Sequence, residues 1–340
     1  MGVMSRETAG ALIEAAFAAA DEHGAVSFAF QGGEPTVAGL DFFRDFVAMV
    51  SAFRPLDRQV SYALQTNGMA LNEEWTHFLK ENQFLVGLSV DGYRELHDHY
   101  RVDTKGEGTY GRVAKALALL QKFEVETNLL CVVTGQCAKH PQKTYASMKK
   151  LGVRYLQFIP CLDPLEEQRG RAVYSLTPKL YGDFLCGLFD QWYRDWAEGH
   201  YTSVRLFDDY VHLAMGEPAS TCAASGGCGS YFVVEADGGV YPCDFYVLDR
   251  WRMGDVHTDS LKQLANDETA SEFLRQGRLR PSRCANCRWV PLCNGGCRRD
   301  WTGGADDTEN YYCESFRRFF EYAADRIGEI AWQERRSRMR

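Results

Sequence analysis

Eight cysteines between residues 222 and 313 have the spacing of metal ligands. Four of them lie in the stretch CANCRWVPLCNGGC (284–297), spaced C-x2-C-x5-C-x3-C, and Cys222, Cys228, Cys243 and Cys313 flank it. Sites made only of thiolates select zinc or iron–sulfur clusters, because soft sulfur suits both. Eight thiolates suffice for two four-ligand sites. The spacing therefore predicts two metal centres and leaves zinc and iron–sulfur as alternatives.

The remaining four cysteines, Cys131, Cys137, Cys161 and Cys186, stand singly among apolar neighbours such as NLLCVV. We expect them to be small buried side chains. A disulfide framework is disfavoured for the whole set, because disulfides are rare in the cytoplasm, where we place this chain.

Polar motifs follow three consecutive apolar segments in the first half of the chain. They read QGGEPT (31–36), QTNG (65–68) and SVDG (89–92), and Arg101 comes soon after the third. The two glycines of the first motif allow close approach of backbone to a ligand, and Glu34 offers a carboxylate to an amine. A structural turn is the alternative for each motif taken singly. Together they predict a ligand site at the carboxyl ends of parallel strands.

The elements that must position these residues alternate between two kinds. Short segments that are apolar throughout, separated by segments of helical period, indicate a parallel sheet covered by helices. The predicted strands are 26–31, 60–67, 84–91, 126–134 and 153–160. The predicted helices are 4–22, 39–53, 72–82, 108–123 and 139–151.

The second half of the chain differs from the first in composition and pattern. A polar linker (163–175) precedes two predicted helices, 177–199 and about 205–215, and from Cys222 on there are glycine-rich turns, short strands and a closing helix at about 314–335. We therefore divide the chain into a barrel region, a linker with helices, and a cysteine-rich region with its closing helix. Their limits are 1–162, 163–220 and 221–340.

Composition excludes several classes of function. The formal net charge is −8 and the pI about 5.6, so no basic surface for nucleic acid is expected. No apolar run approaches the roughly 20 residues that span a bilayer. Glu7 and Glu14 interrupt the first segment, which favours an amphipathic helix over a signal peptide. We expect a cytoplasmic protein without a nucleic-acid or membrane partner.

The motifs FQGGEPT, QTNG and SVDG and the whole cysteine array resemble radical S-adenosylmethionine (radical SAM) enzymes with a SPASM domain, and in particular the anaerobic sulfatase-maturating enzymes. The resemblance extends from about residue 4 to 330. It implies two auxiliary 4Fe–4S clusters. The ligands implied for the first are Cys222, Cys228, Cys243 and Cys297, and those for the second are Cys284, Cys287, Cys293 and Cys313.

The same resemblance implies an enzyme that uses S-adenosylmethionine (AdoMet) to oxidise a cysteine or serine of a sulfatase polypeptide to formylglycine. A reducing electron donor such as flavodoxin or ferredoxin is implied too. The implied AdoMet-lining residues are Gln31, Gly32, Gly33, Glu34, Ser89, Arg101 and Leu162, with Gln65 and Asn67 as further candidates. Asp91 is expected to cap the turn before Gly92.

Asp244 is the catalytic base implied by the resemblance. It directly follows the cluster ligand Cys243 in the motif YPCDFY. A carboxylate there would lie beside the electron acceptor and could take the substrate's proton. The alternative is a turn aspartate that accepts hydrogen bonds from backbone amides.

One motif of the family is missing. The family carries C-x3-C-x2-C in the loop after its first barrel strand, and no such triplet occurs in these 340 residues. The family's barrel has six strands and five are found here. The predicted fold is therefore α/β, a partial (β/α)6 radical SAM barrel that lacks its first strand, followed by a SPASM domain and a C-terminal helix. We expect the missing segment upstream of Met1, true loss being the alternative. A third, radical cluster is expected only with that segment, and the chain as given is expected to be inactive.

Three other functions stay open. One is another SPASM peptide-modifying enzyme, which cross-links a ribosomal peptide; the aspartate after the third cysteine argues against it. A second is a non-catalytic iron–sulfur protein that binds peptide or relays electrons, supported only by the missing triplet. The third is a zinc-binding scaffold, which the predicted ligand site in the first half disfavours.

Overall fold

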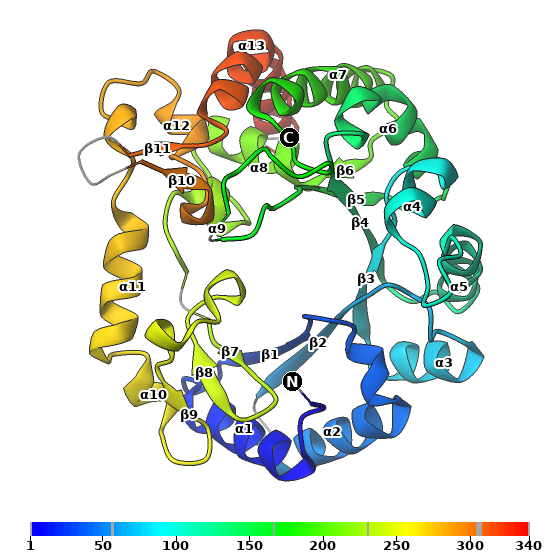
Figure 1. Ribbon diagram of the computed structural model, residues 1–340, viewed down its shortest axis with the longest axis vertical. Helices are drawn as coiled ribbons and strands as arrows, with labels where there is room; N and C mark the ends of the chain where they lie inside the picture. The colour runs from blue at the N-terminus through cyan, green and yellow to red at the C-terminus, as the bar shows by residue number, and fades with distance from the viewer. Residues whose placement is uncertain (1, 56–57, 166, 230, 304–307, 339–340) are drawn as a thin grey trace. The chain divides into compact units, whose positions relative to one another are not determined.

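A six-stranded sheet organises the chain (Figure 1). The structure is a computed structural model that describes residues 2–55, 58–165, 167–229, 231–303 and 308–338. The strand order is β1-β2-β3-β4-β5-β6, and parallel pairing joins β1 to β2, β2 to β3, β4 to β5 and β5 to β6. The strands are β1 (Ala25–Phe30), β2 (Gln59–Thr66), β3 (Phe84–Ser89), β4 (Thr127–Val133), β5 (Tyr155–Pro160) and β6 (Ser203–Val204).

The predicted parallel α/β architecture is confirmed, and β1 to β5 lie where the apolar segments predicted them. The count of five strands was one too low, because the sheet also contains β6. This strand has two residues and lies between two helices, so it is too short to show any period in the sequence. The strand expected upstream of Met1 stays a prediction.

The predicted helices of the first half are also present. They are α1 (Arg6–Ala19), α2 (Leu40–Phe53), α3 (Glu73–Glu81), α5 (Tyr110–Lys122) and α6 (Pro141–Lys149). Side chains cap the N-termini of two of these helices: Ser5 accepts a hydrogen bond from the Thr8 N–H of α1, and Asn72 accepts one from the Trp75 N–H of α3. Helix α4 (Arg94–Tyr100) was not predicted, since seven residues give too little periodic signal.

The chain forms two compact units. Unit 1 comprises Met1–Leu88, Arg112–Thr127 and Gly229–Gln276. Unit 2 comprises Ser89–Gly111, Asn128–Cys228 and Gly277–Arg340. Each unit thus combines segments from the predicted barrel region with segments from the predicted cysteine-rich region. The sequence limits 1–162, 163–220 and 221–340 stay a prediction.

Helix α1 is at the centre of unit 1. One side of it, with Ile13 and Phe17, packs against Phe28 of β1 and Phe46 of α2. Its other side packs against a small sheet of β7 (Val233–Val234), β8 (Gly239–Tyr241) and β9 (Gly254–Asp255) and against α10 (Leu261–Leu264). Each such buried side chain contributes about 1.5–3 kcal/mol. Helix α1 therefore holds part of the cysteine-rich region to β1 and α2. The next helix, α11 (Glu268–Arg278), was not predicted.

Three helices form the core of unit 2. They are α7 (Pro178–Ala197), α8 (Arg205–Ala214) and α13 (Cys313–Arg338), all three close to their predicted ranges. Phe189, Phe207 and Phe319 form an aromatic cluster with ring centroids 5.2–5.5 Å apart. The short helices α9 (Cys222–Ser225) and α12 (Val290–Cys293) both contact α8. The same core thus supports two cysteine-bearing segments, and β10 (Trp301–Thr302) pairs with β11 (Glu309–Asn310) beside them.

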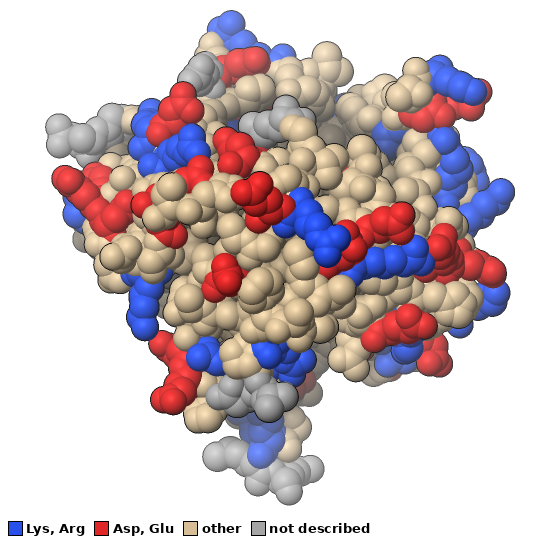
Figure 2. All heavy atoms as spheres, turned by 90° about the horizontal axis from the view of Figure 1, so that it is seen from below, with Lys and Arg blue, Asp and Glu red and all other residues tan. Residues whose placement is uncertain are grey.

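Two surface properties bear on possible partners. Across the described residues, no helix has both the length and the apolar character needed to cross a membrane. Acidic and basic side chains are interspersed over the face shown in Figure 2, without a large area of one sign.

Candidate functional site

The loop that follows β1 in unit 1 is open to solvent. Gln31, Gly32 and Gly33 are exposed, and the two glycines have φ of +87° and +55°. A Cβ at either glycine would meet no heavy atom within 4 Å. The positive φ therefore explains the glycines, and the space around them leaves the backbone accessible to a ligand. This geometry suits the AdoMet-lining role predicted for the loop.

Glu34 ties the end of this loop to the end of β2. Its Oε1 accepts hydrogen bonds from Thr36 N (3.1 Å), Thr36 Oγ1 (2.6 Å) and Thr66 Oγ1 (2.7 Å), while Oε2 accepts from Asn67 N (2.7 Å). The carboxylate thus has a structural use that the sequence did not reveal. Oε2, with one donor, keeps capacity for the amine that the sequence predicted.

Arg101 is held by a buried carboxylate in unit 2. Its Nε lies 2.6 Å from Oδ2 of Asp91, and the Asp91 side chain is 6% exposed. Asp91 Oδ1 also accepts the Val132 N–H of β4 at 2.9 Å. The expectation that Asp91 caps the turn before Gly92 is therefore wrong. Its carboxylate serves Arg101 and β4, because burial of the charge demands ionic and N–H partners.

A directional chain of hydrogen bonds fixes the backbone of Arg101 as well. Burial lowers the pKa of His97, and its Nδ1 accepts the Asp91 N–H at 3.1 Å, so the neutral ring carries its proton on Nε2. That proton points to Thr109 Oγ1 at 3.0 Å, and the Thr109 hydroxyl donates to the Arg101 carbonyl at 2.9 Å. Both ends of Arg101 are thereby fixed before any ligand binds.

The predicted AdoMet-lining residues fall into two groups. Gln31, Gly32, Gly33 and Glu34 belong to unit 1 at the end of β1. Ser89, Arg101 and Leu162 belong to unit 2: Ser89 ends β3 and is 8% exposed, and Leu162 follows β5. Within unit 2, burial and then the carboxylates of Asp163 and Asp91 raise the pKa of Cys161 to about 11. Asp91 accepts the Val132 N–H, and the Cys161 N–H donates to the Val133 carbonyl. The Asp91–Arg101 pair therefore lies near the segment that carries Leu162.

Asp244 is exposed and has a tyrosine partner in unit 1. It opens a 3-10 turn directly after Cys243, and its Oδ1 accepts the Tyr231 hydroxyl at 2.8 Å. The same hydroxyl is 3.4 Å from Cys243 Sγ. Burial, and then the thiol of Cys243, raise the pKa of Tyr231, so the phenol keeps its proton and stays a donor. These contacts differ from the backbone capping that a turn aspartate would make.

The four thiols assigned to the second cluster are electrostatic neighbours within unit 2. Burial is the main cause of the raised pKa of Cys293, about 12, and Cys284, Cys313 and Cys287 add to it in that order. The pKa of Cys313 is likewise raised, by burial and then by Cys287. Cys313 is also the first residue of the 26-residue helix α13, where the helix dipole favours a thiolate.

Three of the four thiols assigned to the first cluster belong to unit 2, and Cys243 belongs to unit 1. Cys222 opens α9, whose N-cap Thr221 donates its hydroxyl to the buried carboxylate of Asp209 at 2.7 Å. Burial raises the pKa of the Cys228 thiol, the nearby Arg298 opposes this, and Cys222 adds to it.

Asn294 connects the α9 turn to the stretch 284–297. Its Nδ2 donates to Ala224 O at 2.9 Å, and its Oδ1 accepts from Arg280 at 3.0 Å. Asn294 has φ of +52°, a conformation that asparagine tolerates better than most residues. The two cysteine-bearing segments of unit 2 are thus held together by a side chain that is not itself a thiol.

The donor set fits iron–sulfur clusters. All twelve cysteines are free thiols, so none is used up in a disulfide. In the described ranges, no three side chains from histidine, cysteine, aspartate or glutamate stand close enough to hold a single metal ion. Two of the four isolated cysteines, Cys131 and Cys137, are fully buried as predicted, while Cys161 and Cys186 are half-buried. The eight-cysteine assignment stays a prediction that this geometry suits.

Sequence reasoning missed several residues that support these sites. The sequence predicts a turn cap at Asp91 and gives no signal for His97, Asp209 or Tyr231. The hydrogen-bond partners of Asp91 lie 6 to 41 residues away in the sequence, and those of Tyr231 lie 12 to 13 residues away. Pairings over such distances leave no local pattern. The place of Asp91 within the SVDG motif is the signal that the sequence offers.

Two domain matches agree with this arrangement. Residues 4–148 match the Radical SAM superfamily, and residues 226–288 match SPASM, an iron–sulfur cluster-binding domain. The class is therefore that of radical SAM proteins with a SPASM domain. The cysteine-type anaerobic sulfatase-maturating enzyme of Clostridium perfringens (strain 13 / Type A) is 43% identical over 332 residues, 97% of this chain and 89% of that protein. This chain belongs to the anaerobic sulfatase-maturating enzyme family.

Other relatives and solved structures agree. The cysteine-type enzyme of Clostridium novyi (strain NT) is 40% identical over 97% of this chain and 88% of that protein. The serine-type enzyme of Bacteroides thetaiotaomicron is 30% identical over 88% of this chain and 76% of that protein. The structure "Native anSMEcpe with bound AdoMet and Kp18Cys peptide" matches with a TM-score of 0.94 and 43% identity, over 98% of this chain and 92% of that one. Streptococcus suis SuiB, at 13% identity and a TM-score of 0.55, shares the fold alone.

Proposed function

We propose that this protein oxidises the active-site cysteine of a sulfatase polypeptide to formylglycine by AdoMet radical chemistry. The observation that carries the proposal is the 43% identity, over nearly the whole chain, to a cysteine-type anaerobic sulfatase-maturating enzyme. The match to a structure with bound AdoMet and a peptide supports it. Identity to serine-type enzymes is lower, 30%, which favours cysteine over serine as the preferred substrate residue.

The reaction removes one hydrogen atom from the substrate Cβ, one proton from its sulfur and one electron, and water then replaces sulfur, released as hydrogen sulfide, to give the aldehyde. Bound AdoMet and the iron–sulfur clusters supply hydrogen-atom abstraction and electron acceptance. Asp244 takes the thiol proton, because it is an exposed carboxylate directly after a cluster ligand. Tyr231 donates to Oδ1 of Asp244 and leaves Oδ2 for the substrate proton.

The AdoMet-lining residues bind and orient rather than react. The open backbone at Gly32 and Gly33 allows close approach of the ligand, and Glu34 Oε2 can accept from its amine. In unit 2, Arg101 presents a charge that Asp91 has already oriented, so little side-chain entropy is lost when the ligand carboxylate binds.

The 340 residues hold no C-x3-C-x2-C triplet, so they do not fit the radical cluster. The proposal also includes a cytoplasmic location and a reducing partner such as flavodoxin or ferredoxin. Both follow from the family resemblance and from a cysteine-rich array that needs reducing conditions.

The test compares two peptides that carry a sulfatase motif with cysteine or serine at the reacting position. The protein is extended at its N-terminus by a segment that supplies the triplet, reconstituted with iron and sulfide, and incubated with AdoMet and reductant. We expect an aldehyde, detected by mass spectrometry, to form faster from the cysteine peptide. A cross-linked peptide in place of the aldehyde would indicate the other SPASM chemistry. No modified peptide would contradict the proposal.

A further inference from the structure

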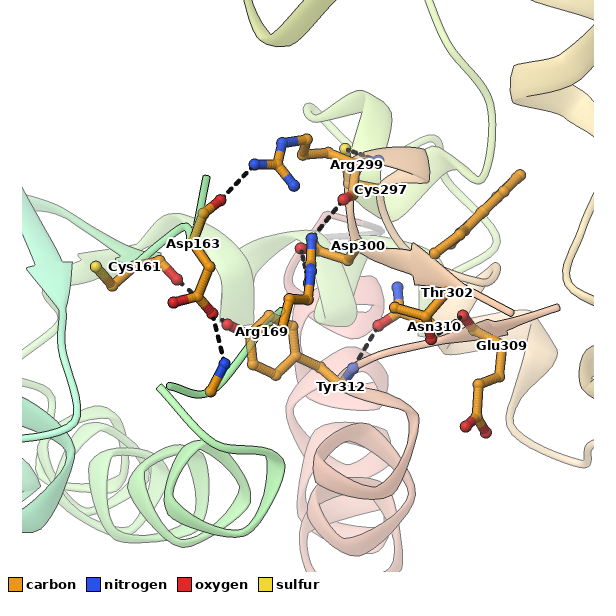
Figure 3. Close-up of polar contacts among 12 residues, drawn as sticks. Cys161, Asp163, Arg169, Cys297, Arg299, Asp300, Thr302, Glu309, Asn310 and Tyr312 are labelled. Carbon is orange, nitrogen blue, oxygen red and sulfur yellow. Dashed lines mark hydrogen bonds and ion pairs between the residues drawn. The ribbon is translucent and has the colours of Figure 1, made fainter. Parts of the chain in front are cut away.

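A buried ion pair joins the segment after β5 to the segment after Cys297, both in unit 2 (Figure 3). Arg169 Nη1 lies 3.0 Å from Asp300 Oδ1, and the two side chains are only 12% and 10% exposed. Arg169 Nη2 also donates to the backbone carbonyl of Arg299 at 2.5 Å. One guanidinium thus holds two of the three residues of the 3-10 turn Arg298–Asp300, which Cys297 precedes.

Arg299 also connects the segment after Cys297 to the segment after β5. Its Nη2 donates to the backbone carbonyl of Asp163 at 2.5 Å, and its backbone N–H donates to Sγ of Cys297 at 3.4 Å. Asp163 directly follows Leu162, one of the predicted AdoMet-lining residues. Arg299 therefore connects the sulfur of a predicted cluster ligand to the backbone beside Leu162 (Figure 3).

The segment that receives Arg299 is itself fixed. Asp163, 5% exposed, accepts the Gly170 N–H on Oδ2 at 3.0 Å and the Ser175 hydroxyl on Oδ1. Tyr312, just before α13, donates its hydroxyl to the Cys161 carbonyl at 3.3 Å. The residues on both sides of Leu162 are therefore anchored.

Stability alone does not account for this network. Three charged side chains are buried, Asp163, Arg299 and Asp300, and that of Arg169 is only 12% exposed; the cost of removing such charges from water often exceeds their mutual attraction. What the network does achieve is geometric. It fixes the direction of the Arg299 N–H toward the Cys297 sulfur. Hydrogen bonds to ligand sulfurs and local charge both set the reduction potential of an iron–sulfur cluster.

We propose that Arg299 is a positioning residue for Cys297 and that, held by Arg169, it raises the reduction potential of the auxiliary cluster to which Cys297 contributes. The proposal rests on the proposed function only for the presence of auxiliary clusters. The reduced cluster carries the more negative charge and therefore gains more from an N–H donor than the oxidised cluster does, which gives the sign of the shift. The connection also keeps the electron acceptor in a fixed relation to Leu162.

The test uses the full 340-residue protein, reconstituted anaerobically with iron and sulfide, and needs neither AdoMet nor a sulfatase. Redox titration followed by electron paramagnetic resonance measures the potential of each auxiliary cluster. We expect Arg299→Met to lower one potential and leave the other unchanged, with about eight iron atoms per chain retained. Arg169→Met should shift the same potential in the same direction by less, because Arg169 acts on Cys297 through Arg299 and Asp300.

The matched control is Arg171→Met, which removes an exposed arginine from the same segment. It should leave both potentials unchanged. Unchanged potentials in both Arg299→Met and Arg169→Met would overturn the proposal, as would an equal shift in Arg171→Met. The Arg299→Met protein could instead lose one cluster while its circular dichroism shows that the helices persist. Cys297 is then no longer held in place as a ligand, and this outcome supports the proposal. Clusters that respond as expected, with no formylglycine formed by the triplet-bearing extension of the chain, would refute the proposed function alone.

Discussion

The hydroxyl of Tyr231 lies 2.8 Å from Asp244 Oδ1 and 3.4 Å from Cys243 Sγ, so one phenol serves both the proposed base and a predicted cluster ligand. The hydrogen can point to only one acceptor at a time. Once Cys243 is a metal-bound thiolate its charge is shared with the metal, and the aspartate becomes the stronger acceptor. Tyr231 is then expected to keep Asp244 oriented with Oδ2 toward the substrate.

Asp244→Asn should leave both auxiliary clusters in place and lower the rate of formylglycine formation about 10²- to 10⁴-fold, the usual contribution of a general base. Tyr231→Phe should cost less, roughly 10-fold, since it removes one hydrogen bond to a charged group. Rates are measured with the triplet-bearing extension of the chain. Asp249→Asn, an exposed aspartate in the next 3-10 turn, is the control. An unchanged rate in Asp244→Asn would show that another group is the base.

Asp91→Asn should weaken AdoMet binding by roughly tenfold or more, because Arg101 loses the charge that orients its guanidinium. The neutral amide can still accept the Val132 N–H, so the fold should persist. Isothermal titration with the extended, cluster-loaded protein measures the affinity. Glu95→Gln, on the exposed side of α4, should bind AdoMet as the unmodified protein does. Equal affinities for both variants would mean that Arg101 needs no partner.

Local patterns predicted much of this fold, and their limits are physical. Strands β1 to β5 have six to eight residues each, are mostly apolar and are separated by turns and helices, so length and composition identify them. Strand β6 has two residues and cannot show a period. Helix α11 was missed because its apolar stripe is short and its mean character is polar.

The same distinction between local and long-range features applies to the candidate site. The cysteine array, the glycine loop and Asp244 are local motifs, which the sequence displays directly. The supporting contacts are not local: Arg299 and Asp163 are 136 residues apart. Asp91 was misread because a buried aspartate next to a turn looks like a cap until its partner Arg101 is known. Such pairings are fixed by tertiary packing, which a single sequence does not record.

Gly277→Ala should impair loading of the cluster to which Cys228 contributes. A Cβ at Gly277 would lie 2.3 Å from Cys228 Sγ and 2.7 Å from its Cβ, far inside contact distance. We expect iron to fall from about eight to about four atoms per chain after reconstitution. Gly328→Ala is the control, since a Cβ there meets nothing within 4 Å, and in the interior of α13 it should stabilise the protein by up to about 1 kcal/mol. Full iron content in Gly277→Ala would indicate that Cys228 is not a ligand.

The anaerobically reconstituted protein should contain about eight iron and about eight sulfide per chain, from two four-iron clusters. Cys293→Ala should remove about half of each, because this thiol lies among the three others assigned to its cluster. Cys186→Ala should remove none, since Cys186 is a half-buried thiol of α7 outside the array. Iron, sulfide and zinc are measured together. Stoichiometric zinc without sulfide would replace the cluster assignment by structural zinc sites.

Residues 1–340 alone should not cleave AdoMet reductively, even with both auxiliary clusters loaded. A radical cluster needs one iron open to chelate the amino and carboxylate groups of AdoMet, and three cysteines leave that position free. The eight cysteines from Cys222 to Cys313 are assigned four and four, so both auxiliary clusters are closed. An extension of about 30 residues that supplies a strand and a C-x3-C-x2-C loop should restore cleavage, because that length suffices for one strand, a loop and a turn of helix. The measurement is 5′-deoxyadenosine formation under strong reductant by both proteins. Substantial product from the 340-residue chain would mean that one of the eight cysteines is not a ligand and that an auxiliary cluster has an open iron.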